Sequence, residues 1–342
     1  MTIRYDYAGG GFDAWAPRLA GYDAAFLVEL YRRMLRIREI ELEIERRYRQ
    51  DHMKTPIHLV IGQEATSVGC CAAMRVGDLA YSSHRTHGVY LAKGGDLKAM
   101  LSEMHCRIDG CAGSRGGSMH LIDFSVGMAG TSAIVAGSVP IATGAALAAQ
   151  MQGADRVIAV FFGEAATEEG VVSECLNFAA LKKLPILFFC ENNFYSVQSP
   201  LSERQPARDI SHWAAAHAVP AVCVDGMNVL AVHEAACAAI GRARAGGGPG
   251  FIEARVYRYR AHGGNGDDSA TGYRSVAERE AWEQHCPVEN YYGLLKAAGL
   301  LDDAGRAAMH QAIVAETLAA FEHALAAPHP VEADLTTHVY AE

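Results

Sequence analysis

The chain has 342 residues and carries 30 Lys and Arg against 39 Asp and Glu, a net charge of −9. Because no basic stripe stands out that would neutralise phosphates, we expect no nucleic-acid partner. Half of the residues are hydrophobic and a fifth are charged, so the chain can bury the core of one large domain or two ordinary ones and is not disordered as a whole.

The sequence carries no sign of membrane insertion or export. Its most apolar window, 133–151, is interrupted by Gly137, Pro140 and Gly144, which favours a buried turn and a packed helix over a membrane span. The first 15 residues lack the apolar core of a signal peptide. The nine cysteines are scattered without a paired CxxC, so we expect free thiols in a reducing cytoplasm, with no disulfide frame or zinc site.

Three segments near the N-terminus predict helices. Apolar residues recur every three or four positions over 23–50, which predicts an amphipathic helix of about 42 Å at 1.5 Å per residue. Such a helix either is an arm that packs against a partner or across the body of the fold, or is an ordinary core helix. Residues 62–74 and 96–105 predict two more helices, the second capped by Asp96.

The middle of the chain alternates between strand and helix patterns. Residues 156–162 and 185–190 are continuous apolar runs, as expected of strands covered on both faces in a parallel sheet. The helical period of 167–183 between them predicts a right-handed crossover. Further along, the same patterns predict a strand, a helix and a strand over 221–224, 229–245 and 251–259.

These patterns together predict an α/β fold, a doubly wound and mainly parallel sheet with an N-terminal helical arm and a C-terminal helical tail. After Tyr273 the chain is predicted to be helical again to about residue 326 and to end in a short polar tail. The predicted divisions are the arm, a central α/β domain and the C-terminal helical segment, at 1–56, 57–275 and 276–342.

Polar side chains follow two successive predicted strands. Glu164 and Asn193 lie 29 residues apart at the ends of these strands, where ligands bind in open parallel sheets. Such a pair can supply two oxygen ligands to Mg²⁺, and the helix that begins near Thr167 adds amides and a positive dipole end for a phosphate. The alternative is structural: Glu164 simply starts the helix, and Asn193 forms an ordinary turn.

At this point the sequence resembles a family. The spacing from 163–165 to 192–193 is similar to the thiamine-diphosphate fingerprint, and the chain resembles the alpha subunit of the decarboxylating component of 2-oxo acid dehydrogenase complexes, of the pyruvate, branched-chain and acetoin types. The likeness covers most of the chain in eight ordered blocks, at 61–65, 84–88, 115–120, 134–135 with 139–140, 184–185, 191–193, 224–227 and 257–259. The resemblance implies a central domain that binds thiamine diphosphate and Mg²⁺.

The resemblance also assigns site residues. It implies that a divalent metal is held by Glu164, Asn193 and the main-chain carbonyl of Tyr195, and that Arg85 and His262 contact the diphosphate, where a guanidinium binds phosphate oxygens in a forked geometry. The predicted catalytic residues are His262 and His87. The other predicted cofactor contacts are His84, Ala133, Ile134, Val135, Gly163, Ala165, Ala166 and Ser196.

Several of these assignments have structural alternatives. The alternative for Arg85 is a salt bridge on the surface or at a helix end, although the histidines on either side favour a cofactor role. His84 and His87 have the spacing of an HxxH metal motif, but Arg85 between them would repel a cation. Residues 133–135 are assigned to a loop whose main chain holds the aminopyrimidine, yet as side chains they are indistinguishable from core residues.

The chain departs from the family pattern at the metal site. Glu164 replaces an aspartate and is one methylene longer, so the site must shift its backbone, accept a more forgiving cation such as Ca²⁺ or Mn²⁺, or bind the cofactor weakly. Ala165 replaces a fingerprint glycine and takes a positive φ angle less easily. His84 replaces a tyrosine.

The segment after His262 departs from the family as well. The family's phosphorylated serine is missing, so we expect no regulation by that kinase. The segment 263–272 holds four glycines and two aspartates, and it is expected to be either a mobile loop that shapes the substrate entrance or a solvated surface loop.

The resemblance implies half of an active site. In this family, the glutamate that activates the cofactor's pyrimidine belongs to a beta subunit, so the chain is expected to work in an α2β2 heterotetramer. The expected substrate is a small 2-oxo acid or an acetoin-like compound. The expected acceptor is a lipoyl-bearing acyltransferase or a carrier protein. The alternatives are a transketolase-like two-carbon transfer from a keto sugar to a carrier protein, and a noncatalytic subunit with a decayed metal site. A nicotinamide site is disfavoured because no GxGxxG follows a strand.

Overall fold

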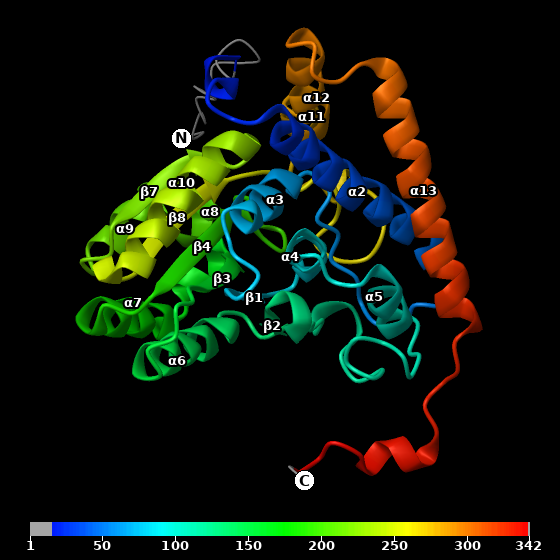
Figure 1. The fold of residues 1–342 in the computed structure, drawn as a ribbon, viewed down its shortest axis with the longest axis horizontal. Helices are drawn as coiled ribbons and strands as arrows, with labels where there is room; N and C mark the ends of the chain where they lie inside the picture. The colour runs from blue at the N-terminus through cyan, green and yellow to red at the C-terminus, as the bar shows by residue number, and fades with distance from the viewer. Residues whose placement is uncertain (1–15, 341–342) are drawn as a thin grey trace.

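The fold is built on a six-stranded sheet in which every neighbouring pair of strands is parallel (Figure 1). The computed structural model describes residues 16–340. The strand order is β2-β1-β3-β4-β8-β7. The bounds are β1 (Leu79–Ser82), β2 (Met128–Thr131), β3 (Ile158–Gly163), β4 (Ile186–Asn192), β7 (Ala221–Asp225) and β8 (Gly250–Arg255).

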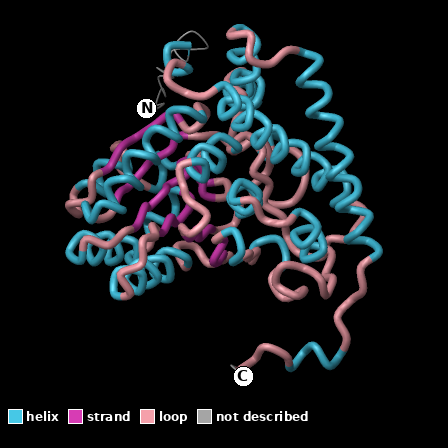
Figure 2. Tube along the Cα trace, in the orientation of Figure 1, coloured by secondary structure: helices cyan, strands magenta, loops and turns pink. Residues whose placement is uncertain are grey.

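Helices cover both faces of this sheet, so the predicted doubly wound architecture is confirmed (Figures 1 and 2). Because side chains alternate along a strand, Phe161 and Phe189 enter one core while Phe162 and Phe188 enter the other. The first core includes residues of α3 (Glu64–Ala72) and α10 (Val229–Arg242). The second includes residues of α6 (Ser138–Met151), α7 (Gly170–Lys182) and α9 (Ile210–Ala215).

The long periodic segments form the predicted helices. The N-terminal pattern gives α2 (Ala24–Tyr48), capped where the Asp23 carboxylate accepts a hydrogen bond from the Phe26 N–H at 3.2 Å. Asp96 caps α5 (Leu97–Met104) as predicted, through the Ala99 N–H at 2.7 Å. The patterns over 62–74, 167–183 and 229–245 correspond to α3, α7 and α10.

Several short elements were not predicted, among them β1, β2 and α4, and one strand is shorter than expected. The strands β1 and β2 have only four residues each, too few to show a period, and α4 (Thr86–Lys93) follows β1 directly. The strand predicted over 251–259 ends at Arg255. Beyond it the chain leaves the sheet, and the Tyr259 N–H donates to the Ile61 carbonyl at 3.0 Å.

The N-terminal and C-terminal helices pack against each other. The helix α2 contacts α3, α12 (Pro287–Ala297) and α13 (Asp303–Ala326), so it lies across the body of the fold (Figure 1). The C-terminal segment also contains α11 (Val276–Glu283), and the tail carries a 3-10 turn, η7 (Glu332–Thr336). Residues 1–15, which belong to the predicted arm and for which no signal peptide was expected, lie outside the described residues. The division of the chain at 56 and 275 stays a prediction.

Two further sequence expectations concern cysteines and membranes. All nine cysteines are free, as predicted. Over residues 16–340, none of the helices is both long enough and apolar enough to span a bilayer.

The irregular segment after α5 is held by one buried carboxylate. Glu103 is 1% exposed, and its two oxygens accept four main-chain hydrogen bonds between 2.7 and 3.0 Å. The donors are the N–H groups of Ala112, Ser114, Gly116 and Gly117. The loop can close on the carboxylate because Gly110 has no Cβ, which would lie 2.4 Å from a Glu103 oxygen.

We predict that Glu103→Gln lowers the free energy of unfolding by about 2–3 kcal/mol, because the new NH₂ group would face two N–H donors. Urea denaturation followed by circular dichroism measures this change. The exposed Glu322→Gln is the matched control, with an expected change within about 0.5 kcal/mol. Equal midpoints for the two variants would show that Glu103 does not hold the loop.

Candidate functional site

The candidate site lies at the carboxyl edge of the sheet. Since all strands run in one direction, their carboxyl ends meet there, and the strand order reverses between β1 and β3. Gly163 pairs with Glu191 in the β3–β4 register. Glu164, which follows the end of β3, therefore lies beside Asn192, the last residue of β4, and Asn193 comes next.

Glu164 is buried and forms an ion pair with an arginine of the same chain. Its side chain is 2% exposed, and one carboxylate oxygen accepts a hydrogen bond from Arg204 Nη2 at 2.5 Å. Burial raises the pKa of Glu164, and Arg204 opposes that rise. Arg204 belongs to α8 (Leu201–Arg204), which sequence reasoning did not connect with this site.

Asn193 and Tyr195 belong to a tight turn after β4. The Asn193 side-chain oxygen accepts from the Tyr195 N–H at 3.3 Å, and its Nδ2 donates to Gln63 Oε1 at 3.2 Å. The Tyr195 hydroxyl donates to the Glu278 carboxylate, 2.8 and 2.9 Å from its two oxygens. Ser196 pairs with Ser199 in the small hairpin of β5 (Tyr195–Ser196) and β6 (Ser199–Pro200).

The remaining fingerprint positions lie at the end of β3. Gly163 is its last residue, and Ala165 and Ala166 lie in the 3-10 turn η4 (Glu164–Glu168). Ala165 is not among the residues with positive φ, so replacing the fingerprint glycine by alanine causes no backbone strain here.

Three histidine rings pack together near Arg85, with His58 in T-shaped contact with the other two. The ring centroid of His58 lies 5.2 Å from that of His84 and 4.9 Å from that of His262. Burial, with the charge of Arg85 nearby, lowers the pKa of His58 to about 2 and that of His262 to about 4. Burial likewise lowers the pKa of His84. All three rings are therefore neutral at pH 7.

Arg85 is held by main-chain carbonyls. Its two terminal nitrogens donate to Leu59 O at 2.8 Å and His262 O at 3.0 Å. Burial, with Arg258 nearby, lowers its pKa to about 9, so it stays charged at pH 7. The structure thus brings Arg85, His84 and His262 together, while their predicted contacts with the cofactor stay predictions.

His87 lies apart from these rings in a closed buried network. It is fully buried, with Nδ1 2.6 Å from Glu41 Oε1 and Nε2 2.8 Å from Ser118 Oγ. The other Glu41 oxygen accepts from the Val60 N–H at 2.7 Å. Both ring nitrogens of His87 are therefore engaged, an arrangement suited to positioning the segment after Arg85. Its predicted catalytic role stays a prediction.

The segment assigned to the aminopyrimidine lies on the surface. Ile134 is 70% exposed and Val135 is 47% exposed, while Ala133 is half-buried. The interpretation of these side chains as core residues is wrong for Ile134 and Val135. They lie between β2 and α6, at the same end of the sheet as Glu164, where exposed apolar side chains suit a ligand or a partner surface.

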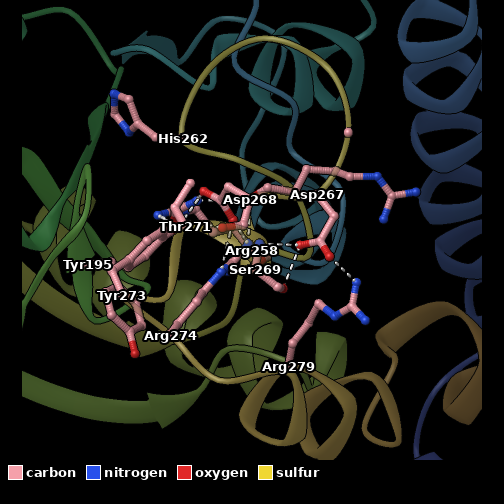
Figure 3. Close-up of polar contacts among 12 residues, drawn as sticks. Tyr195, Arg258, His262, Asp267, Asp268, Ser269, Thr271, Tyr273, Arg274 and Arg279 are labelled. Carbon is pink, nitrogen blue, oxygen red and sulfur yellow. Dashed lines mark hydrogen bonds and ion pairs between the residues drawn. The ribbon is translucent and has the colours of Figure 1, made fainter.

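The loop 263–272 is fastened by ion pairs and hydrogen bonds (Figure 3). Asp268 accepts hydrogen bonds from Tyr273, Arg274 and Arg258, and Asp267 accepts from Arg279 at 2.9 Å. Burial raises the pKa of Asp268, but the contacts with Tyr273 and Arg274 outweigh this and hold the pKa below its usual value.

The same network reaches the turn after β4. Arg258 donates to the Val197 carbonyl at 2.5 Å, which ties this loop to the hairpin of Tyr195. These contacts anchor the loop at its two aspartates, while Gly263 and Gly272 are exposed, as in a surface loop. Its expected mobility and its expected role at the substrate entrance stay predictions.

Sequence reasoning missed several residues of this region. His58, Gln63 and Arg204 lie beside the predicted site residues or contact them, but none of the three had a predicted role of its own. The family block at 61–65 already contains Gln63, which was the available signal. For Arg204 the sequence offers none, because its partner Glu164 lies 40 residues away.

The donor set fits a hard cation and a polar ligand. Glu164, Asn193 and the Tyr195 carbonyl offer oxygen donors of the kind that Mg²⁺ prefers. Nearby, His58 Nδ1 and Gln63 Nε2 are buried polar atoms with no hydrogen-bond partner among residues 16–340, as expected where a polar ligand binds. Within residues 16–340, no group of three or more His, Cys, Asp and Glu side chains is placed to hold a metal ion, so any metal would rest on this mixed set.

Comparisons with known proteins agree with this geometry. Residues 32–332 match the model of the family described as dehydrogenase E1 component. The alpha subunit of acetoin:2,6-dichlorophenolindophenol oxidoreductase from Bacillus subtilis is 37% identical over 314 residues, 91% of this chain and 92% of the relative. The alpha subunit of the pyruvate dehydrogenase E1 component from Zymomonas mobilis is 36% identical over 319 residues, 93% of this chain and 89% of the relative.

The chain therefore belongs to the dehydrogenase E1 component family. It is an alpha subunit of a thiamine-diphosphate-dependent dehydrogenase, as the resemblance predicted. The transketolase-like and noncatalytic alternatives are not favoured by these relatives.

The buried histidines predict a pH dependence of stability. The pKa of His58 is lower in the folded protein than its ordinary value of 6.5, so the unfolded chain takes up this proton first as the pH falls. The stabilisation that comes from the neutral, buried ring is therefore complete above pH 6.5 and is lost as the pH falls towards the pKa of the folded state. Each proton that the unfolded chain binds and the folded protein does not makes the free energy of unfolding fall by up to about 1.4 kcal/mol more per pH unit.

We therefore predict that the melting temperature of His58→Gln falls less than that of the wild type between pH 6.5 and 4. Thermal unfolding in matched buffers measures this, and the exposed His212→Gln should follow the wild-type curve. Parallel curves for all three proteins would contradict a buried neutral His58.

Proposed function

We propose that this chain supplies the metal and diphosphate half of the cofactor site in an enzyme that cleaves a carbon–carbon bond next to a carbonyl. The substrate class is a small 2-oxo acid or an acetoin-like compound, and the acyl unit passes to a lipoyl carrier. The observation that carries this proposal is the placement of Glu164 and Asn193 at adjacent strand ends, at the same sheet edge as Arg85 and the histidines.

In this proposal, the metal is Mg²⁺ or a more forgiving cation such as Ca²⁺ or Mn²⁺, held by Glu164, Asn193 and the Tyr195 carbonyl. The hydrogen bond of the Asn193 side chain to the Tyr195 N–H keeps these two residues in one turn. The contact of the Tyr195 hydroxyl with Glu278 fixes the hairpin from its other side.

Thiamine diphosphate supplies the electron sink when it is bound. The residues of this chain bind and orient the cofactor. Arg85 offers a charged guanidinium, already fixed by the carbonyls of Leu59 and His262, to the diphosphate. His262 is neutral at pH 7, because burial keeps its pKa low, and a neutral ring nitrogen could accept or relay a proton when the cofactor is bound.

The partner in this proposal is a beta subunit in an α2β2 assembly. The exposed Ile134 and Val135 support it, because apolar side chains of this size at a site edge are usually covered by a ligand or a partner. We further propose that the enzyme works in the cytoplasm, where nine free cysteines persist as thiols.

Asn193→Ala tests the metal site directly. We predict that it lowers the affinity of the alpha–beta assembly for thiamine diphosphate with Mg²⁺ at least tenfold and leaves the far-ultraviolet circular dichroism unchanged, because one neutral oxygen ligand is lost. Calorimetric titration measures the affinity, and a chelator should weaken wild-type binding in the same way. The exposed Asn177→Ala on α7 is the control. An unchanged affinity in Asn193→Ala, or chelator-insensitive binding, would assign Asn193 to the structural turn alone.

A further inference from the structure

The residue in the metal-binding position is already bound to a positive charge of the chain itself. Glu164 stands where the fingerprint that the chain resembles has the shorter aspartate, and its carboxylate lies 2.5 Å from Arg204 Nη2. Both groups are largely buried, with Glu164 2% and Arg204 12% exposed in their side chains. This is therefore not a screened surface pair.

Each of the three guanidinium nitrogens of Arg204 donates a hydrogen bond to a different residue. Its Nε donates to the Ser199 carbonyl at 3.2 Å, Nη1 pairs with Glu168, and Nη2 pairs with Glu164. The neighbouring Gln205 amide donates to Thr167 Oγ1 at 2.9 Å and to Glu168 at 3.0 Å. The guanidinium would thus remain attached to the turn η4 through Glu168 if its bond to Glu164 were broken.

A guanidinium and a divalent cation compete for the same carboxylate. Mg²⁺ requires its oxygen ligands at about 2.0–2.1 Å in near-octahedral geometry, and a positive charge hydrogen-bonded to the same oxygen repels the metal. In the described structure, the carboxylate of Glu164 is oriented by Arg204. The donor types fit a metal, but the strongest donor is engaged elsewhere.

We propose that Arg204 is an internal counter-cation that competes with the divalent metal for Glu164 and thereby sets the metal affinity of this subunit. Loading of the metal requires Arg204 Nη2 to release Glu164, while Nη1 and Nε keep Arg204 on Glu168 and Ser199. The longer glutamate makes this competition possible because it reaches α8. The inference rests on the proposed function, since it concerns the metal site assigned there.

A purely structural pair makes the opposite prediction. If Arg204 only fastens α8 to η4, its removal loosens the site and weakens metal binding. If Arg204 competes, its removal leaves Glu164 without a counter-cation, and the metal binds more tightly.

The experiment measures Mn²⁺ binding to the cofactor-free alpha–beta assembly, by the loss of the free Mn²⁺ signal in electron paramagnetic resonance. We expect Arg204→Gln to bind Mn²⁺ at least about tenfold more tightly than the wild type. We expect Glu168→Gln to bind it more weakly, because Arg204 then depends on Glu164 alone for a carboxylate. The exposed Arg208→Gln controls for the general loss of a positive charge and should stay within about twofold.

Unchanged or weaker Mn²⁺ binding by Arg204→Gln, or an equal gain in Arg208→Gln, would overturn the proposal. If Arg204→Gln does not assemble, Glu168→Gln decides, and unchanged or tighter binding there overturns the proposal. Thiamine diphosphate binding is measured in parallel. An assembly that binds no thiamine diphosphate with Mn²⁺ contradicts the proposed function, whereas intact cofactor binding with no effect of Arg204→Gln contradicts only this inference.

Discussion

The parallel pairing of β3 with β4 is the constraint on which the site depends. Both strands are almost entirely buried, so their register is fixed by the two cores on either side of the sheet. That register aligns Gly163 with Glu191. A shift by one residue would exchange the faces of every side chain, and it would separate Glu164 from Asn193. The site geometry therefore follows from burial of the apolar runs.

Acidic side chains inside the protein fix the irregular segments around this edge. Glu103 binds four main-chain N–H groups after α5, and Glu41 binds the Val60 N–H and His87. Asp268 and Glu45 hold the loop after His262 through arginines and the Gly266 N–H. Part of the chain's negative charge is thus structural. Glu164 differs from these residues, because its partner is a single arginine and its proposed partner in the working enzyme is a metal.

Sequence reasoning predicted the parts of the fold with long and uniform patterns. The strands β3 and β4 and the helices α2, α7 and α10 carry such patterns, whereas β1 and β2 are too short to show one. For the site, the resemblance to the family predicted Arg85, Glu164, Asn193 and His262. The Glu164–Arg204 pair, the packing of His58 against His262 and the exposure of Ile134 were not predictable, because each depends on contacts between segments distant in sequence or on the final surface.

In the proposed function, this chain binds the metal–diphosphate end of thiamine diphosphate at the carboxyl edge of its sheet. Hydrogen–deuterium exchange of the alpha–beta assembly, with and without thiamine diphosphate and Mg²⁺, measures this binding segment by segment. We expect slower exchange on cofactor addition in the strand-end segments of this chain, 131–136, 163–168, 192–196 and 256–264. Cofactor binding without slower exchange at 163–168 and 192–196 would contradict it.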